Sequence, residues 1–196
     1  MQRRHLMLAG FALATAPSIL RPATAQNANN NVAAAAGAPP MSEADAKHSK
    51  DTLKVGSLSL AQSRLALKHA HLGRVKQFAG FEVAEQETIA DVLKSMMIDP
   101  RQQSASTKPP SDDEVMANLD NEGKAMMQRL ESLKGAQFDE AYVSAQLEGH
   151  QKLLDIQEAY LKTDPGREAL NTTKLARGMI KEHLALLSDL KGQVKG

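Results

Sequence analysis

The chain has 196 residues, of which 42% are hydrophobic but only 3% aromatic, and it contains neither tryptophan nor cysteine. This length allows one domain with a proper core, and this composition favours helices over sheets. The lack of cysteine excludes disulfides, thiolate metal sites and a lipid-anchored cysteine, so a metal ion would need nitrogen and oxygen ligands. A formal net charge of +1 without a basic stripe argues against a nucleic acid partner.

Residues 1–25 are predicted to be a secretory signal peptide. Arg3 and Arg4 precede an apolar run at residues 6–16, and small residues at 23–25 form a cleavage site. The paired arginines partly fit a twin-arginine signal, so the general secretory and twin-arginine routes both stay open. The apolar run is too short for an ordinary transmembrane helix, and no later segment is apolar enough to span a membrane. We therefore expect a soluble protein of the periplasm.

The folded domain is expected to cover residues 42–192, after a flexible, low-complexity leader at residues 26–41. Ser42 and Asp45 form an N-terminal capping pattern for a first helix over residues 43–70. Leu53, Leu60 and Leu67 recur every seven residues, which predicts burial on more than one side. Lys54 falls within an apolar face, so its ammonium group either extends to solvent or points inward as a counter-ion.

A second helix is predicted over residues 74–97, with Glu82 and Gln86 one turn apart at the centre of its apolar face and Glu85 at the edge. A carboxylate in such a position is costly unless it is paired or binds a cation. The polar residues 98–110 then form a long loop. A shorter helical region follows over residues 111–133, with a break near residues 118–121.

The longest clean helical pattern covers residues 138–161 and predicts a central helix of a bundle. Between its two apolar stripes lie three polar residues, Gln146, His150 and Gln157. A last helix is predicted over residues 167–190, with His183 at the centre of its apolar face. Buried polar groups need partners, so the contacts of His150 become the central question.

Three helices thus place polar groups on faces that should meet: Glu82 and Gln86, Gln146 and His150, and His183. Helical bundles build metal sites from such side chains, and this set suits iron, zinc or manganese. Neither histidine has the spacing of a Glu-x-x-His motif. The alternative is a hydrogen-bonded core network in which Glu82 is paired by a protonated histidine or by Lys54.

The remaining histidines near the first helix are expected at the surface. They are His48, His69 and His71. The chain has no Ser/His/Asp arrangement, glycine-rich phosphate loop or Cys/His cluster, so hydrolase and nucleotide-binding functions receive little support. We predict no catalytic residue.

Three segments resemble the DUF4142 family, whose members are also labelled predicted outer membrane proteins. These segments are VKQFAGFEVAEQ at residues 75–86, GAQFDEAYVSAQLEGHQKLL at residues 135–154 and MIKEHLALL at residues 179–187. The resemblance covers residues 42–190 and implies an exported helical bundle of the ferritin-like type. His150 and His183 match the family's histidines. Glu85-Gln86 replaces an Asp-His pair of the family, and Lys54 aligns with a family glutamate, so di-iron oxidation is not expected.

The predicted fold is therefore an all-α, ferritin-like four-helix bundle with an extra short helix in the long second-to-third connection. The favoured function is a bundle of the cell envelope that is non-catalytic or weakly metal-binding, with an internal site of Glu82, Gln86, His150 and His183. One alternative is a ferritin-like metalloenzyme that handles iron or peroxide with the same residues. Another is an interaction module that pairs through a leucine stripe with a second copy or an envelope partner.

Overall fold

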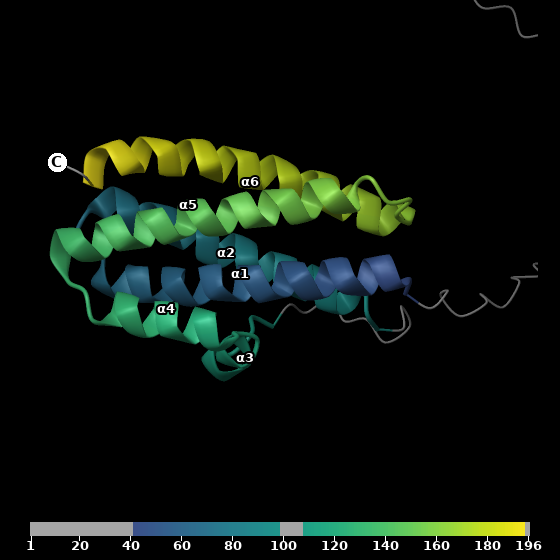
Figure 1. The fold of residues 1–196 in the computed structure, drawn as a ribbon, viewed down its shortest axis with the longest axis horizontal. Coiled ribbons are helices and arrows are strands. Elements are labelled where there is room, and N and C mark those ends of the chain that lie inside the picture. Colours follow the sequence, from purple (N-terminus) through teal and green to yellow (C-terminus); the bar gives the residue numbers. More distant parts are fainter. Residues whose placement is uncertain (1–40, 99–107, 195–196) are drawn as a thin grey trace, which may run out of the picture. The chain divides into compact units, whose positions relative to one another are not determined.

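The computed structural model describes residues 41–98 and 108–194, and four long helices form a bundle within these ranges (Figure 1). The long helices are α1 (Glu43–His69), α2 (Gly73–Ser95), α5 (Gly135–Tyr160) and α6 (Arg167–Val194). Helix α1 packs against α2 and α5, and α6 packs against α5 and α2. Within the described ranges there is no strand, so the predicted all-α helical bundle is confirmed.

The second-to-third connection gives the bundle its topology. The predicted extra helical segment consists of two helices, α3 (Asp112–Ala117) and α4 (Asn121–Glu131), which are separated near the predicted break at residues 118–121. Both pack against α1, and α4 returns the chain to the end of the bundle at which α2 begins (Figure 1). Helices α2 and α5 therefore run in the same direction, as in a ferritin-like bundle, while neighbouring long helices are antiparallel.

Short polar caps fix several helix ends. Ser42 Oγ accepts a hydrogen bond from Asp45 N at 3.1 Å, and the Asp45 carboxylate accepts one from Ser42 N at 3.2 Å, which is the predicted capping box of α1. Asp139 on α5 is fully buried and accepts hydrogen bonds from the backbone of His71 and Leu72. It thereby holds the turn between α1 and α2 against α5.

The face that α1 turns toward the bundle is made of small residues. They are Ser49, Thr52, Gly56, Ser59, Ser63 and Ala66, at alternating spacings of three and four residues. Their hydroxyl groups meet longer polar side chains of α5. The pairs are Ser63 with Tyr142 at 2.8 Å, Ser59 with Gln146 at 2.6 Å and Thr52 with Gln157 at 3.0 Å. A polar layer therefore runs between these two helices.

The leucine pattern of α1 was misleading. Leu60 is buried, but it packs with Val115 and Leu119 under α3 and α4, whereas Leu67 is 42% exposed. The proposed pairing stripe of Leu53, Leu60 and Leu67 is therefore not a continuous exposed surface, because α3 and α4 cover its middle.

The main apolar core lies among the four long helices. Its largest members are Phe78, Phe138, Tyr142, Leu187 and Leu190. None of the helices within the described ranges combines the length and the hydrophobicity that a membrane crossing requires. The predicted signal peptide and nearly all of the predicted leader lie outside these ranges, as does most of the loop predicted at residues 98–110.

Candidate metal centre

Glu82 of α2, His150 of α5 and His183 of α6 meet inside the bundle and form a candidate metal centre. Glu82 Oε2 lies 3.1 Å from His150 Nε2 and 2.9 Å from His183 Nδ1, and the two ring nitrogens are 3.2 Å apart. Glu82 and His150 are fully buried, and His183 is 6% exposed. Three side chains with metal-binding atoms thus converge from three helices, as the sequence predicts.

The register of each helix forces these side chains inward. On α6 the buried positions follow one another at spacings of three or four residues, and His183 falls between Ile180 and Leu187 in that series. On α2, Glu82 is one turn beyond Phe78. Because residues at such spacings share one face of a helix, the apolar neighbours fix the direction of the polar side chains.

The second polar atom of each of the three side chains contacts another group of the protein. His150 Nδ1 lies 2.8 Å from the backbone carbonyl of Gln146, which can only accept, so this nitrogen carries the proton. His183 Nε2 lies 3.3 Å from Glu85 Oε2, and Glu82 Oε1 accepts a hydrogen bond from Ser59 Oγ at 2.5 Å. These contacts leave His150 Nε2, His183 Nδ1 and Glu82 Oε2 facing the centre, as in metal sites whose histidines are oriented by outer partners.

The charges in the cluster favour an ionised Glu82. Burial alone would raise the pKa of Glu82, but hydrogen bonds with His150 and His183 hold this pKa well below its usual range. Burial also lowers the pKa of His183, and this effect is outweighed by the hydrogen bond to Glu82 and the negative charge of Glu85, so the pKa is raised. Burial raises the pKa of Glu85 itself. When no metal ion is bound, the raised pKa of His183 favours a proton on this ring beside the Glu82 carboxylate.

The spacing of the three central atoms fits a coordination sphere. Ligands at about 2.0–2.2 Å from an ion, with angles of about 90–110°, are roughly 2.8–3.6 Å apart. The distances of 2.9, 3.1 and 3.2 Å among these atoms lie within that range. Two imidazoles and one carboxylate suit zinc, iron and manganese. The donor set and its orientation therefore fit a single transition-metal ion.

Two of the predicted site residues lie elsewhere. Gln86 is buried, but its amide oxygen lies against Gly56, and it has no hydrogen bond with the three central side chains. Lys54 forms an ion pair with Asp120 at 2.6 Å, and its side chain is 52% exposed. Of the two alternatives for Lys54, the structure has the one in which the ammonium group extends to solvent, because α4 offers it a carboxylate at the surface.

Sequence reasoning missed other buried polar residues. His48 was expected at the surface, yet it is 7% exposed, stacks on Tyr160 and lies 2.8 Å from Gln157 Oε1. Ser59 was not considered as a partner of Glu82. The stripe of small residues on α1 could have predicted that both residues are buried, because a face with short side chains lets neighbouring helices pack closely against it.

Comparison with known proteins identifies a family. The family model described as "Domain of unknown function (DUF4142)" matches residues 30–192. No curated protein and no solved structure matches the chain significantly.

Proposed function

The chain belongs to the DUF4142 family, and from that premise we propose that it is an exported bundle of the cell envelope with one internal transition-metal site. The observation that carries the proposal is the convergence of Glu82 Oε2, His150 Nε2 and His183 Nδ1. The other polar atom of each side chain already has a partner in the protein. We propose Glu82, His150 and His183 as ligands, and Ser59 and Glu85 as the residues that position them.

A site of this kind holds one ion and binds it weakly at low pH. Gln86 and Lys54 point away from the cluster, so no second set of ligands is present beside it in the described residues. A bound iron, zinc or manganese ion would supply Lewis acidity, and the raised pKa of His183 means that the ion has to displace a proton. The geometry thus favours a mononuclear site over a di-iron centre.

The second candidate function for the cluster is purely structural. Every fully enclosed side-chain nitrogen or oxygen in the described ranges already has a hydrogen-bond partner. A protonated His183 between Glu82 and Glu85 would therefore satisfy the cluster without a metal ion. In the first candidate function a metal ion displaces the proton of His183, whereas in the second the proton stays on the ring.

Calorimetric titration of the metal-free protein distinguishes them. Zinc, manganese or anaerobic ferrous ions are expected to bind at a stoichiometry of one and to release about one proton, because His183 Nδ1 must lose its proton to coordinate. The heat should therefore depend on the ionisation enthalpy of the buffer. A His183→Gln variant should show no saturable heat, and equal binding by this variant would refute the assignment.

The proposal of export rests on residues 1–25 and is tested separately. When the full chain is expressed in a bacterium with a periplasm, the mature protein should be recovered from the periplasmic fraction with Gln26 at its N-terminus. Intact mass spectrometry measures this directly. An uncleaved chain confined to the cytoplasm would contradict export without affecting the metal site.

A further inference from the structure

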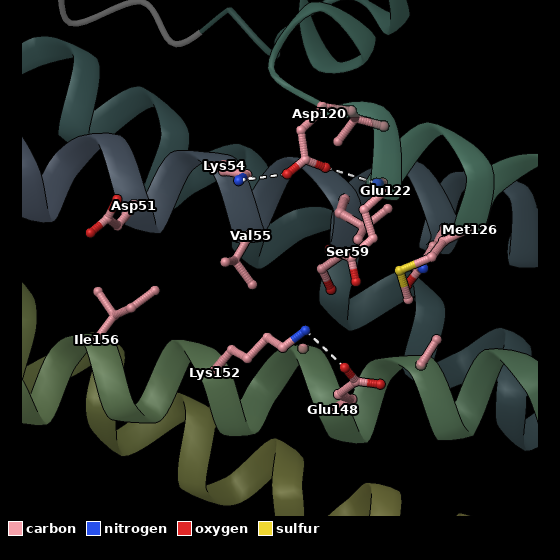
Figure 2. A pocket seen from close by; sticks show the side chains of 16 residues that line it. Asp51, Lys54, Val55, Ser59, Asp120, Glu122, Met126, Glu148, Lys152 and Ile156 are labelled. Atoms are coloured by element: carbon pink, nitrogen blue, oxygen red, sulfur yellow. Dashed lines mark hydrogen bonds and ion pairs between the residues drawn. The ribbon is translucent and has the colours of Figure 1, made fainter.

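A cavity of about 250 Å³ lies between α1, α4 and α5, and none of the three proposed metal ligands lines it. Figure 2 shows the side chains that line it. Its wall is largely apolar and includes Val55, Leu58, Leu119, Met126 and Ile156. A cavity of about 150 Å³ holds benzene, so this one has room for a ligand of roughly ten non-hydrogen atoms.

Small residues on α5 keep this cavity open. Gly149 lines it, and a Cβ atom built on Gly149 would meet no atom within 4 Å. Ala145, one turn earlier, also lines the cavity. A glycine in the middle of a helix makes the helix less stable than an alanine would. Gly149 therefore lowers the stability of α5 but leaves space for a ligand.

The floor of the cavity holds a polar group without a partner. Gln62 is 2% exposed, and its Oε1 accepts a hydrogen bond from Gln146 Nε2 at 3.0 Å. Gln62 Nε2 has no hydrogen bond to any residue in the described ranges. Since every fully enclosed polar side-chain atom there is paired, this nitrogen must open onto space, and Gln62 lines this cavity and the adjoining one between α4 and α5.

Two hydrogen bonds determine how these amides are oriented. Gln146 Nε2 donates to Gln62 Oε1 at 3.0 Å and to the carbonyl oxygen of Ser59 at 3.3 Å. In this arrangement Gln62 presents its oxygen to Gln146 and its nitrogen to the open side. Ser59, 3% exposed, also lines the cavity, and its Oγ lies 2.5 Å from Glu82 Oε1 and 2.6 Å from Gln146 Oε1. Its single proton goes to one of these acceptors, and the hydroxyl lone pairs can accept a hydrogen bond.

The polar and charged groups around the cavity favour a neutral ligand. Lys54 is paired with Asp120 at 2.6 Å and Lys152 with Glu148 at 2.8 Å, so neither lysine is free to bind an acid (Figure 2). Asp51 and Glu122 also line the cavity and would attract a cation. An ammonium group, however, has no lone pair to accept a hydrogen bond from Gln62 Nε2.

We propose that this cavity binds a small neutral amphipathic molecule, with its apolar body against the aliphatic wall and a primary amide or hydroxyl group between Gln62 and Ser59. Either head group accepts from Gln62 Nε2 and donates to Ser59 Oγ. The proposal does not require a bound metal ion.

The test uses the full chain, labelled with ¹⁵N, and four probes of equal length: hexanamide, 1-hexanol, hexanoate and hexylammonium. The signals to follow are the backbone amide of Gly149 and the side-chain amide of Gln62. Saturable shifts are expected for hexanamide and 1-hexanol, with at least tenfold weaker binding of the two charged probes. Absence of saturable shifts, or tighter binding of a charged probe, would overturn the proposal.

Two glycine variants separate occupancy of the cavity from general effects. Gly149→Leu should fill the cavity, keep or raise the melting temperature and abolish the shifts at Gln62. Gly178→Leu is the matched control, because a Cβ there also meets nothing within 4 Å but Gly178 lies on α6. This variant should bind the probes as the wild type does.

If Gly149→Leu does not fold, the Gln62→Met variant provides the test. It removes the amide but keeps the side-chain length, so it should weaken the binding of hexanamide at least tenfold. Unchanged binding by the folded variant would refute the site.

Discussion

The bundle contains two buried histidine clusters that are built in opposite ways. In the candidate metal centre, Glu82, His150 and His183 turn their metal-binding atoms toward one another. In the His48 cluster, formed by Asp45, His48, Gln157 and Tyr160, each contact joins complementary groups. His48 Nε2 meets Gln157 Oε1 at 2.8 Å, its ring stacks on Tyr160 at 3.9 Å, and the Tyr160 hydroxyl donates to Asp45.

This difference separates a metal-binding site from a structural hydrogen-bond cluster. Converging atoms that mostly accept require a proton or a cation among them, whereas complementary pairs require neither. Burial alone therefore does not identify a metal site, since both histidines, His48 and His150, are buried. The direction in which the lone pairs of the buried side chains point does identify it.

The largest expected effect is on the stability of the metal-free protein. His150→Ala should lower the free energy of unfolding by about 3–5 kcal/mol, because it removes a buried partner of Glu82 and leaves a cavity. His48→Ala should cost only about 1–3 kcal/mol, the usual penalty for a lost hydrogen bond at a buried group. Urea unfolding with chelator present measures both values. Equal losses would mean that the two clusters are energetically alike.

The stabilisation that zinc binding gives should also distinguish the two clusters, and it is expected to be slightly smaller than the loss caused by His150→Ala. At a free zinc concentration one hundred times the dissociation constant, binding stabilises the native state by about 2.7 kcal/mol. The melting temperature of the wild type and of His48→Gln should therefore rise on adding zinc, while that of His183→Gln should not. A shift that survives in His183→Gln would place the ion elsewhere.

The two clusters should also respond to pH with opposite signs. The pKa of His183 is raised above its ordinary value of 6.5, so its contribution to stability is present below pH 6.5 and is lost as the pH rises through the raised pKa. Burial lowers the pKa of His48 below 6.5, so its contribution is present above pH 6.5 and is lost as the pH falls through the lowered pKa.

Melting curves of the metal-free protein between pH 5 and pH 9 measure these contributions. His183→Gln should remove the decline on the alkaline side, and His48→Gln should remove the decline on the acidic side. Glu82 adds a further loss only below its ordinary pKa of 4.5, because its pKa in the native state is lowered. The same direction of change in both histidine variants would contradict the proposed charge states.

The smallest expected effect concerns Glu85, which positions His183. Glu85→Gln should weaken zinc binding roughly tenfold, since outer partners of ligating histidines typically contribute that much. Glu182→Gln is the matched control: it removes the same charge next to His183 in sequence, but Glu182 is exposed and has no hydrogen bond to the ring. Calorimetry compares the two affinities. Equal weakening would mean that only the charge matters.

Much of the fold follows from the sequence because the helices carry clear periodic patterns. The inward direction of Glu82, His150 and His183 was predicted from their apolar neighbours, and the capping box at Ser42 marked the start of α1. The break between α3 and α4 was also predicted, at residues 118–121. These features depend on local spacing, which a single sequence displays.

The errors concern α1, whose inward face is small and polar. Its leucines suggested burial on their own faces, but Leu67 is 42% exposed, because the stripe that contains Ser59 faces the bundle. The sequence left two orientations of Lys54 open, and the choice between them depended on Asp120, which the chain brings close only through α4. Such tertiary contacts are not encoded in the period of one helix.

The most direct test of the account is metal analysis of the untagged protein, expressed with its own leader and purified without chelator. The wild type and a His48→Gln control should contain nearly one equivalent of iron, zinc or manganese, and the His150→Ala/His183→Ala double variant should contain almost none. A wild type free of metal, with a double variant that only melts earlier, would contradict the account. The cluster of Glu82, His150 and His183 would then be a structural network like the one around His48.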